Sequence, residues 1–300
     1  MMESLNQKDT PQTCANRIVL TQDQLMIPGI RSFGWQRDIK ANSPLPDHFH
    51  ENALELTFIL DGSYTFRIGN ANYSLGGGEL FIAYPDEVHS TGQLPMSVGE
   101  IYWIQLELSR LENFLFLSRE ASSSLIRRFC RFGQHVLPTR KKEILSLLSR
   151  AFSCALSGEE NERYLCAALL AACLNLLCCE MCEKSDNRLS CLTPDMEAAL
   201  HYIHANLREA LTLEEVAAVS GLSLSQFKQK FRQQTGASPR DYINRKKIDL
   251  SAQLLLAGKS KTEVAMELNF NTSSYFASVF RKYHSCTPSE YVARKKKGTR

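Results

Sequence analysis

The chain has 300 residues, enough for two domains, and its 44% apolar and 22% charged residues are typical of folded soluble proteins, which excludes a disordered chain. Its longest nearly apolar run, residues 164–179, is shorter than the roughly 20 residues that span a bilayer, and its polar N-terminus lacks the apolar core of an export signal. The net charge is +3, but residues 193–300 hold 17 Lys and Arg against 10 Asp and Glu, which indicates a polyanion-binding module on an acidic remainder. We therefore expect a cytoplasmic protein with no membrane partner, whose ten cysteines are reduced thiols.

Short stretches of β-branched and aromatic residues, separated by Gly, Asn, Asp and Pro, occupy residues 17–108. Residues 54–60 and 63–68 flank Asp61-Gly62, and a β-hairpin is predicted here because Asp-Gly supplies the positive φ of a tight turn. Further strands are predicted at residues 72–75, 79–84 and 101–108. Several short strands at close spacing favour a sandwich or a barrel.

Residues 111–183 change to the helical spacing of apolar side chains. Two sets recur at this spacing: Ile144, Leu147, Leu148, Ala151 and Phe152, then Leu165, Leu169, Ala172, Leu176 and Cys179. Ser157-Gly158 separates them, so the pattern predicts a helical hairpin. The second helix is apolar nearly all round and must be buried, either in its own domain or against a second copy of the chain.

An internal repeat lies in the C-terminal third. Glu215-Val216-Ala217 recurs 48 residues later as Glu263-Val264-Ala265. Four residues recur after 49 positions: Phe227, Phe231, Pro239 and Tyr242 are matched by Phe276, Phe280, Pro288 and Tyr291. Each copy has the features of a helix-turn-helix motif.

In the first copy, Thr212 is predicted to cap a helix whose Val216 and Val219 face inward, and the turn is at Ser220-Gly221-Leu222. Ser223 caps the second helix, which a pair of phenylalanines one turn apart anchors. Its outward face can donate to base edges and neutralise phosphates through Ser225, Gln226, Lys228, Gln229 and Arg232.

In the second copy, Val264, Ala265 and Leu268 are predicted to be buried, Asn269-Phe270-Asn271 forms the turn, and Thr272 or Ser273 is the cap. The outward face of its second helix consists of Ser273, Ser274, Ala277, Ser278 and Arg281.

A helix that starts at Pro239 and ends near Gly258 is predicted to join the two copies. Arg245, Lys246 and Lys247 lie on or beside it, and Arg245 and Lys246 are predicted to bind DNA, where basic side chains contact phosphates. A rigid connecting helix would let the two helix-turn-helix motifs bind in two successive major grooves of the duplex, roughly 34 Å apart. An ordinary helical bundle with a solvated basic face is the alternative, but two motifs in tandem disfavour it.

Residues 195–294 closely resemble the DNA-binding domain of the AraC/XylS family of bacterial transcription regulators. The stretches LTLEEVAAVSGLSLSQFKQKFRQQTGASPRDYINRKKI and EVAMELNFNTSSYFASVFRKYHSCTPSEY carry this resemblance. It implies that both second helices recognise DNA, with Ser225, Lys228 and Gln229 of the first helix and Ser273, Ser274, Ala277 and Ser278 of the second reaching bases.

Two positions depart from the family pattern, because Asn269 and Ser285 stand where glycine is usual. The second reading face is also small, and serines rarely make the bidentate base contacts that discriminate best. We therefore predict that the first copy carries most of the direct readout and that the second mainly positions the domain through phosphates.

One site-like cluster lies in the β region, where His48 and His50 fall on the same side of a strand and are followed by Glu55 and His89. The spacing resembles the HxH…E…G pattern of cupin barrels, but the second half resembles more the ligand-sensing barrel of AraC-type regulators, which usually holds a small effector, often a sugar, without metal. Three interpretations stay open: metal ligands, hydrogen-bonding groups of an effector pocket, and structural polar residues. The expected interpretation is an effector pocket without metal.

Aromatic and basic residues of the same region are further candidates to line this pocket: Tyr64, Arg67, Tyr84 and Trp103, of which Tyr64 and Trp103 are predicted to bind the effector. The CxxC within Cys178-Cys179-Glu180-Met181-Cys182 has no second pair at zinc spacing, and helical cysteines are usually small buried hydrophobes.

The sequence thus predicts a two-domain α+β protein, with a polar arm at 1–16, a cupin-like barrel with a helical hairpin at 17–183, a linker at 184–194 and an all-α tandem helix-turn-helix domain at 195–300. We expect a transcription regulator without enzyme activity or cofactor. Its expected partners are promoter DNA, a small effector such as a carbohydrate, a second copy of the chain and, as a further candidate, RNA polymerase. The alternatives are a metal-dependent cupin enzyme with a DNA-binding tail and a constitutive regulator with a purely structural barrel.

Overall fold

The computed structural model describes residues 5–109, 111–139, 142–183, 193–235 and 237–297. They divide into two compact units, the first made of the described residues within 5–37, 45–92 and 99–183 and the second of those within 38–44, 93–98 and 193–297.

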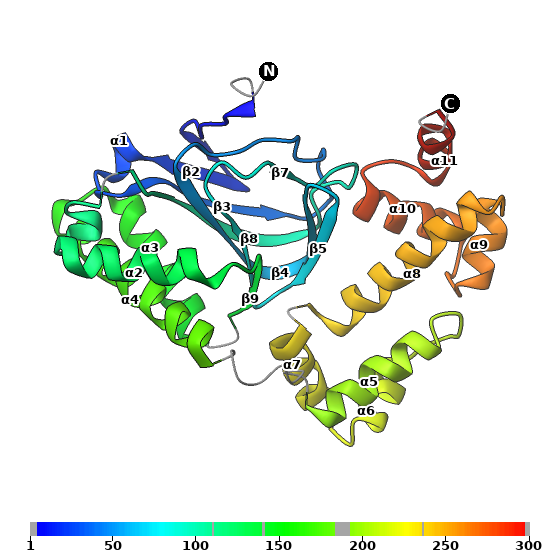
Figure 1. The fold of residues 1–300 in the computed structure, drawn as a ribbon. Coiled ribbons are helices and arrows are strands. Elements are labelled where there is room, and N and C mark those ends of the chain that lie inside the picture. The colour runs from blue at the N-terminus through cyan, green and yellow to red at the C-terminus, as the bar shows by residue number, and fades with distance from the viewer. Residues whose placement is uncertain (1–4, 110, 140–141, 184–192, 236, 298–300) are drawn as a thin grey trace. The chain divides into compact units, whose positions relative to one another are not determined.

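The first unit is built on an antiparallel sheet (Figure 1). Within the described residues its strands are β1 (Gln12–Cys14), β2 (Arg17–Thr21), β3 (Ile30–Asp38), β4 (Ala53–Ile68), β5 (Ala71–Gly76), β6 (Glu79–Ala83), β7 (His89–Ser90), β8 (Gly99–Glu107) and β9 (Val136–Pro138). The order is β1-β2-β3-β8-β4-β6-β9, and β5 and β7 also pair with β4. The strands predicted at residues 72–75, 79–84 and 101–108 are thus confirmed as β5, β6 and β8.

The hairpin predicted at Asp61-Gly62 is wrong, because β4 runs unbroken through this point. Gly62 has the expected positive φ of 89°, but it serves a bulge, where the pairing register with β8 shifts between Ile59 and Asp61. The first half of β4 pairs with β6 and β8, and the second half pairs with β5 and β7. The tight turn falls later, where Ile68 pairs with Ala71.

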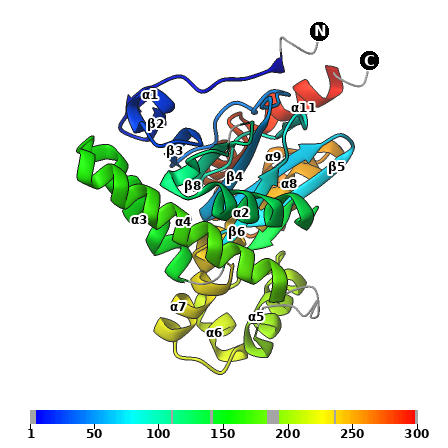
Figure 2. The same cartoon turned by 60° about the vertical axis from the view of Figure 1, so that its left-hand side comes forward.

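Helices cover one face of this sheet (Figure 2): α2 (Arg119–Phe132), α3 (Lys142–Ser157) and α4 (Glu160–Glu183). Leu54, Leu56 and Phe58 of β4 lie in the same core as the helices, and Phe152 of α3 packs edge-on against Phe33 at 4.9 Å. Alternation along the strands sends Glu55 and the side chains in register with it to the opposite face.

The predicted helical hairpin is confirmed as α3 and α4, with Gly158 at φ +71° between them. By length and composition α4 could cross a membrane over Glu160–Met181, longer than the apolar run alone suggests, but 56% of its most apolar stretch is buried inside the protein. The buried residues include Cys166, Leu170 and Leu174. The apolar residues of α4 that recur at helical spacing from Leu165 to Cys179 lie on the more exposed side of the helix, where Ala172 and Cys179 are open to solvent.

Most of the helical cysteines are buried, as predicted: Cys154, Cys166, Cys173 and Cys178. Burial raises the pKa of Cys166 and of Cys173 to about 12, so both stay thiols at neutral pH. Cys179 is exposed, and the side chain of Cys182 lies outside the described residues, so the predicted inertness of the CxxC stays a prediction.

The second unit is helical, with α5 (Pro194–Ala205), α6 (Leu213–Val219), α7 (Leu224–Thr235), α8 (Pro239–Leu256), α9 (Lys261–Glu267), α10 (Ser273–His284) and α11 (Pro288–Lys297) (Figure 1). It has two separate cores: one contains Met196, Phe227 and Phe231, and the other contains Phe276 and Phe280. The chain is therefore α+β.

The predicted N-terminal arm and the predicted linker can be compared with the structure only in part. The arm predicted at residues 1–16 contains β1, which pairs with β2. The predicted linker falls mostly on residues 184–192, which lie outside the described part of the chain.

Candidate DNA interface and buried histidine cluster

The first helix-turn-helix consists of α6 and α7. Thr212 caps α6 in a reciprocal pair with Glu215, as its Oγ1 accepts from the Glu215 amide at 3.2 Å. Gly221 takes φ +68° in the turn. Val216 is fully buried, but the prediction that Val219 faces inward is wrong: it is 42% exposed, and Ala217 occupies the buried side instead.

Helix α7 packs into the core through one face and exposes polar residues on the other face. Phe227 and Phe231 are fully buried with ring centroids 5.3 Å apart. Lys230 Nζ lies 2.7 Å from Asp195 Oδ2, which ties α7 to α5. The polar residues predicted to contact DNA are all exposed: Ser225, Gln226, Lys228, Gln229 and Arg232.

Gln226 has a second role that the sequence analysis missed. Its Oε1 accepts from the Ser223 amide at 3.2 Å, and the Ser223 hydroxyl accepts from the Gln226 amide at 3.4 Å. This reciprocal pair caps α7. Gln226 is therefore a poorer candidate for base reading than Lys228 and Gln229.

The second helix-turn-helix consists of α9 and α10, which begin at the caps Ser260 and Thr272. Thr272 rather than Ser273 is thus the cap of α10. The predicted outward face of α10 is only partly exposed. Ser274, Ser278 and Arg281 are exposed, while Ser273 and Ala277 are half-buried. Tyr275, which the sequence analysis did not select, is 42% exposed on the same helix.

Both departures from glycine occupy left-handed backbone, with φ +52° at Asn269 and φ +56° at Ser285. Asn269 also donates through Nδ2 to the carbonyl oxygen of Arg208. Its side chain thus offsets the backbone strain with a hydrogen bond that glycine would lack.

We expect Asn269→Ala to lower the free energy of unfolding by about 1–2 kcal/mol, because alanine keeps the left-handed strain and loses the hydrogen bond. Asn269→Gly should stay close to the wild type, since relief of strain compensates for the lost bond. Urea denaturation of the three proteins checks this; equal losses for alanine and glycine would show that backbone strain is unimportant here.

The side chains of Lys247, Arg208 and Asn269 connect the loop before α6 with the end of α9 and the turn that follows it. Lys247 of α8 is 7% exposed, and its Nζ donates to the carbonyl oxygens of Leu268 at 2.8 Å and Glu209 at 3.2 Å. Desolvation lowers the pKa of Lys247. Arg208 also pairs with Glu267 at 2.9 Å. Together with the Asn269 bond, these contacts hold the two motifs to one another.

The basic residues predicted beside the connecting helix are less available than the faces of α7 and α10. Arg245 is half-buried and donates to Ser97 Oγ at 2.7 Å. Lys246 is half-buried, with its Nζ 5.6 Å from the centre of the Tyr242 ring. Their assignment to phosphate contacts stays a prediction.

His284 of α10 is packed among aromatic rings, 4.5 Å from the centre of Phe280 and 4.9 Å from that of Tyr291. Its Nε2 is buried without a hydrogen-bond partner among the described residues. Burial is the main cause that lowers the pKa of His284 from 6.5 to about 4, and Arg245 and Lys295 add to it.

We expect the imidazole of His284 to titrate near pH 4 in the folded protein, which an NMR pH titration measures. Because the unfolded chain binds this proton more readily, the stability of the second unit should fall as pH decreases from about 6.5 towards 4. The loss should be absent from His284→Phe; an ordinary titration near pH 6.5 would contradict the buried placement.

In the first unit, the structure brings together all four predicted cluster residues, His48, His50, His89 and Glu55. The His48 amide donates to the His89 carbonyl at 3.0 Å and the His89 amide donates to the His48 carbonyl at 2.8 Å, so the two residues face one another across the sheet. Ring centroids are 4.2 Å apart for His48 and His89 and 5.1 Å apart for His48 and His50. The Glu55 carboxylate lies 2.9 Å from His50 Nε2.

Charges in this cluster are coupled. Burial disfavours the imidazolium of His50, but Glu55 more than compensates, so the pKa of His50 is raised. The pKa of Glu55 is held well below its ordinary value, since the attraction of His50 and His89 outweighs desolvation. The pKa of His48 falls to about 4 because of burial and the neighbouring His89.

Gln105, which the sequence analysis missed, belongs to the same cluster. It lies opposite Glu55 in the β4–β8 register, and its Nε2 is 3.0 Å from Glu55 Oε2 and 3.2 Å from His50 Nε2. A polar residue in a strand of alternating pattern was its only signal in the sequence.

Three of the other candidate pocket residues, Trp103, Tyr84 and Arg67, contact residues outside the histidine cluster. Trp103 is buried, donates through its indole nitrogen to Asp9 at 2.9 Å and stacks under Arg17. Tyr64 is 2% exposed. Tyr84 donates to the carbonyl of Gln134, and Arg67 pairs with Asp47. The effector assignments of Tyr64 and Trp103 stay predictions.

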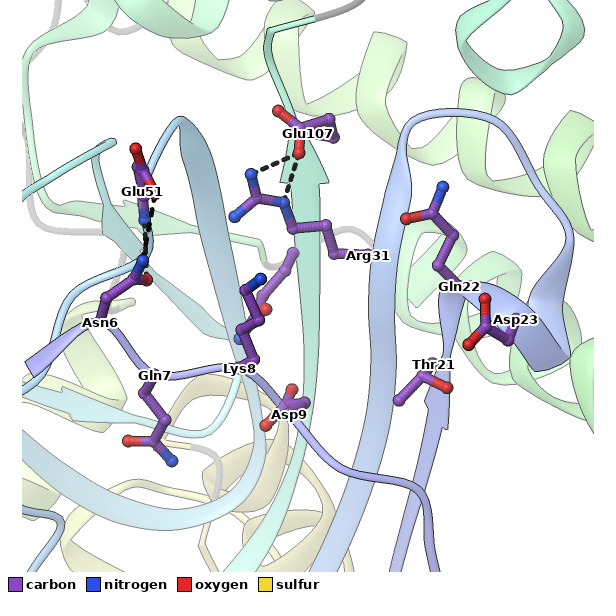
Figure 3. A pocket seen from close by; sticks show the side chains of 11 residues that line it. Asn6, Gln7, Lys8, Asp9, Thr21, Gln22, Asp23, Arg31, Glu51 and Glu107 are labelled. Atoms are coloured by element: carbon purple, nitrogen blue, oxygen red, sulfur yellow. Dashed lines mark hydrogen bonds and ion pairs between the residues drawn. The ribbon is translucent and has the colours of Figure 1, made fainter. Parts of the chain in front are cut away.

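A polar pocket of about 320 Å³ has Gln105 in its lining, and this residue also contacts His50 and Glu55 of the cluster. Figure 3 shows other side chains that line the pocket. Its other walls are residues of the N-terminal arm, β2, α1 (Gln22–Leu25), β3, the loop before β4, and β8: Asn6, Gln7, Lys8, Asp9, Thr21, Gln22, Asp23, Arg31, Glu51 and Glu107. Arg31 pairs with Glu107, and Asn6 donates to Glu51 (Figure 3). None of these described residues is aromatic, so Tyr64 and Trp103, which the sequence predicts to bind the effector, do not line this pocket.

Two family models match the chain. One is described as an AraC-like ligand binding domain and matches residues 37–174; the other is described as a helix-turn-helix domain and matches residues 216–294. The chain belongs to the AraC family of transcription regulators. Its predicted resemblance and its two-part α+β layout are thereby confirmed.

Several relatives match about a third of this chain and less than half of their own length. The probable transcriptional regulator LumQ of Photobacterium leiognathi is 32% identical over 110 residues, which are 36% of this chain and 42% of that protein. The HTH-type transcriptional activator RhaR of Mannheimia succiniciproducens is 23% identical over 74% of this chain and 83% of its own length. The structure of ToxT from Vibrio cholerae O395 has 15% identity and a TM-score of 0.33, and covers 86% of this chain and 95% of that one.

Proposed function

We propose that this AraC-family protein is a sequence-specific DNA-binding transcription regulator that responds to a small polar effector. The observation that carries the proposal is the pair of capped helices, α7 and α10, each anchored by two buried phenylalanines and each exposing a polar outer face. Helix α7 supplies amide and ammonium donors that suit base edges, and α10 supplies hydroxyls and Arg281 that suit phosphates. The contacts through Lys247 and Asn269 give the two helices the fixed relation that binding in two successive major grooves requires.

Selection of bound sequences from random DNA tests this function. We expect enriched sequences to contain one strongly preferred half, read by α7, and one weakly preferred half at the position of α10. Stronger base preferences under α10 than under α7 would overturn the division of roles, and no enrichment would overturn the function.

We propose the pocket beside Gln105 as the effector site. Its volume of about 320 Å³ is at the small end of ligand pockets and suits a monosaccharide-sized molecule. Carboxylates, amides and the Arg31 guanidinium line it, and such donors and acceptors fit the hydroxyl groups of a carbohydrate or related metabolite.

A thermal-shift screen of sugars and sugar acids against the full chain tests the effector site. A ligand that binds here raises the melting temperature of the wild type and loses its effect in Gln22→Ala. Ligands that stabilise both proteins equally would place the effector elsewhere, and no shift across the panel would favour a constitutive regulator.

We also propose that α4 pairs two copies of the chain. Ala168, Ala172 and Cys179 are exposed, and Leu165, Leu169 and Leu176 are half-buried on the same helix. An apolar stripe of small and medium side chains suits close helix packing. Sedimentation at micromolar concentration should show a dimer that Ala172→Arg dissociates; a monomer with and without DNA would contradict the proposal.

A further inference from the structure

We propose that His48, His50, His89 and Glu55 form a binding site for one divalent first-row transition-metal ion in the first unit. This goes beyond the proposed function, and it departs from the sequence-based expectation of an effector pocket without metal. The three histidines are buried, and their nearest ring nitrogens all lie within 4.8 Å of one another.

In all three histidines, the Nδ1 atom lies within hydrogen-bond distance of a backbone carbonyl oxygen. His48 Nδ1 lies 2.9 Å from the carbonyl oxygen of Pro46, His50 Nδ1 lies 2.8 Å from that of Gln7, and His89 Nδ1 lies 2.9 Å from that of Glu87. A carbonyl oxygen only accepts, so each Nδ1 carries the hydrogen, and in a neutral imidazole the lone pair of Nε2 can bind a metal ion. At His50 such an ion would replace the present contact of Nε2 with the Glu55 carboxylate at 2.9 Å. Metal-binding histidines are oriented by such bonds from their second nitrogen.

One of these inward nitrogens has no partner in the described part of the chain. His89 is 1% exposed, and its Nε2 makes no hydrogen bond. The nearest carboxylate oxygen, Glu55 Oε1, is 3.8 Å away, too far for a hydrogen bond. Buried nitrogens are rarely left unsatisfied, and a metal ion between the rings would satisfy this one.

The set of donors fits a particular class of ion. Three imidazoles and one carboxylate suit zinc, manganese, iron, cobalt or nickel, whereas calcium and magnesium prefer oxygen ligands only. Two nitrogens bound to one tetrahedral zinc ion lie roughly 3.4 Å apart, so the histidine nitrogens, which lie within 4.8 Å of one another, must move closer together to bind one ion. Gln105 donates to Glu55 Oε2 at 3.0 Å and would hold the carboxylate in place.

Metal analysis of the full chain, expressed without a histidine tag and purified without chelators, is the first measurement. The stripped protein is then titrated with Co²⁺, whose visible absorption reports nitrogen and oxygen ligation, and Zn²⁺ is measured by competition. We expect about one ion per chain, with a Co²⁺ spectrum that Zn²⁺ abolishes.

Two variants and one control separate this site from adventitious binding. His89→Gln and Glu55→Gln should each weaken Co²⁺ binding by more than the roughly 10–100-fold that loss of a supporting residue costs. His201→Gln, an exposed histidine of α5, should bind as the wild type does. If His89→Gln does not fold, Glu55→Gln and the rise in melting temperature of the wild type with Zn²⁺ decide.

Sub-stoichiometric metal with no Co²⁺ spectrum would overturn the site, and so would equal binding by the wild type, Glu55→Gln and His89→Gln. DNA binding is measured on α7 and α10 of the other unit, so failure of the metal site is distinguishable from failure of the proposed function.

Discussion

Replacing Lys228 and Gln229 together by alanine should weaken binding to a selected DNA sequence by about 2–4 kcal/mol, roughly 30- to 1,000-fold, with a much smaller effect on bulk DNA. Both side chains are exposed on α7, and neither takes part in the hydrogen bonds by which Gln226 caps this helix. Glutamine can make a bidentate pair with adenine, and lysine can donate to guanine, so their loss removes discrimination as well as affinity. Fluorescence anisotropy with the selected duplex and with a scrambled duplex measures both quantities.

The matched control is Ser274→Ala with Ser278→Ala, two exposed positions of α10. We expect a loss below about 1 kcal/mol, because a serine hydroxyl makes a single and less selective contact. A larger loss for this control than for the α7 variant would reverse the roles of the two motifs. Circular dichroism should show unchanged helix content in both, since all four side chains lie outside the cores.

Phe227→Ala should lower the free energy of unfolding by about 3–5 kcal/mol, because the ring is fully buried and its loss leaves a cavity. The cavity lies in the core shared by α5, α6 and α7, so hydrogen exchange should become faster there first. Phe276→Ala should act equally strongly on the separate core of α9 and α10. DNA affinity should fall in both variants.

Val219→Ala is the control for these core variants, because Val219 is 42% exposed although it belongs to the first motif. We expect a change within about 0.5 kcal/mol. Uniform acceleration of exchange across the whole second unit in Phe227→Ala would show that the two cores do not act separately.

The second unit could be predicted closely because its signals are local. Caps, a glycine turn and phenylalanines one turn apart are properties of adjacent residues, and Thr212, Gly221 and Phe227 all take the predicted roles. Val219 was misplaced because helical spacing alone does not choose between neighbouring positions at the end of a short helix.

The first unit could be predicted less well because its strands pair across long stretches of sequence. Asp61-Gly62 has the composition of a hairpin turn, yet the partners available on both sides let β4 continue through it as a bulge. Strand β9 was missed because only its distant pairing with β6 makes residues 136–138 a strand.

The histidine cluster was predicted as residues but not as a site with defined chemistry. Spacing predicted His48 and His50 on one side of a strand, but both lie between β3 and β4, and His48 forms only an isolated β-bridge with His89. The carbonyl partners of their Nδ1 atoms come from loops and from the N-terminal arm, for which the sequence has no signal. The unsatisfied Nε2 of His89 is likewise visible only in three dimensions.

Competition binding measures whether the two anchored helices, α7 and α10, recognise a particular DNA sequence. The full chain and residues 193–300 are each titrated with a selected duplex in physiological salt, with and without excess random-sequence DNA. We expect the selected duplex to bind about 1,000-fold or more tighter than random DNA, with an affinity that falls steeply as the salt concentration rises. Equal affinity for both DNAs, by correctly folded protein, would contradict it.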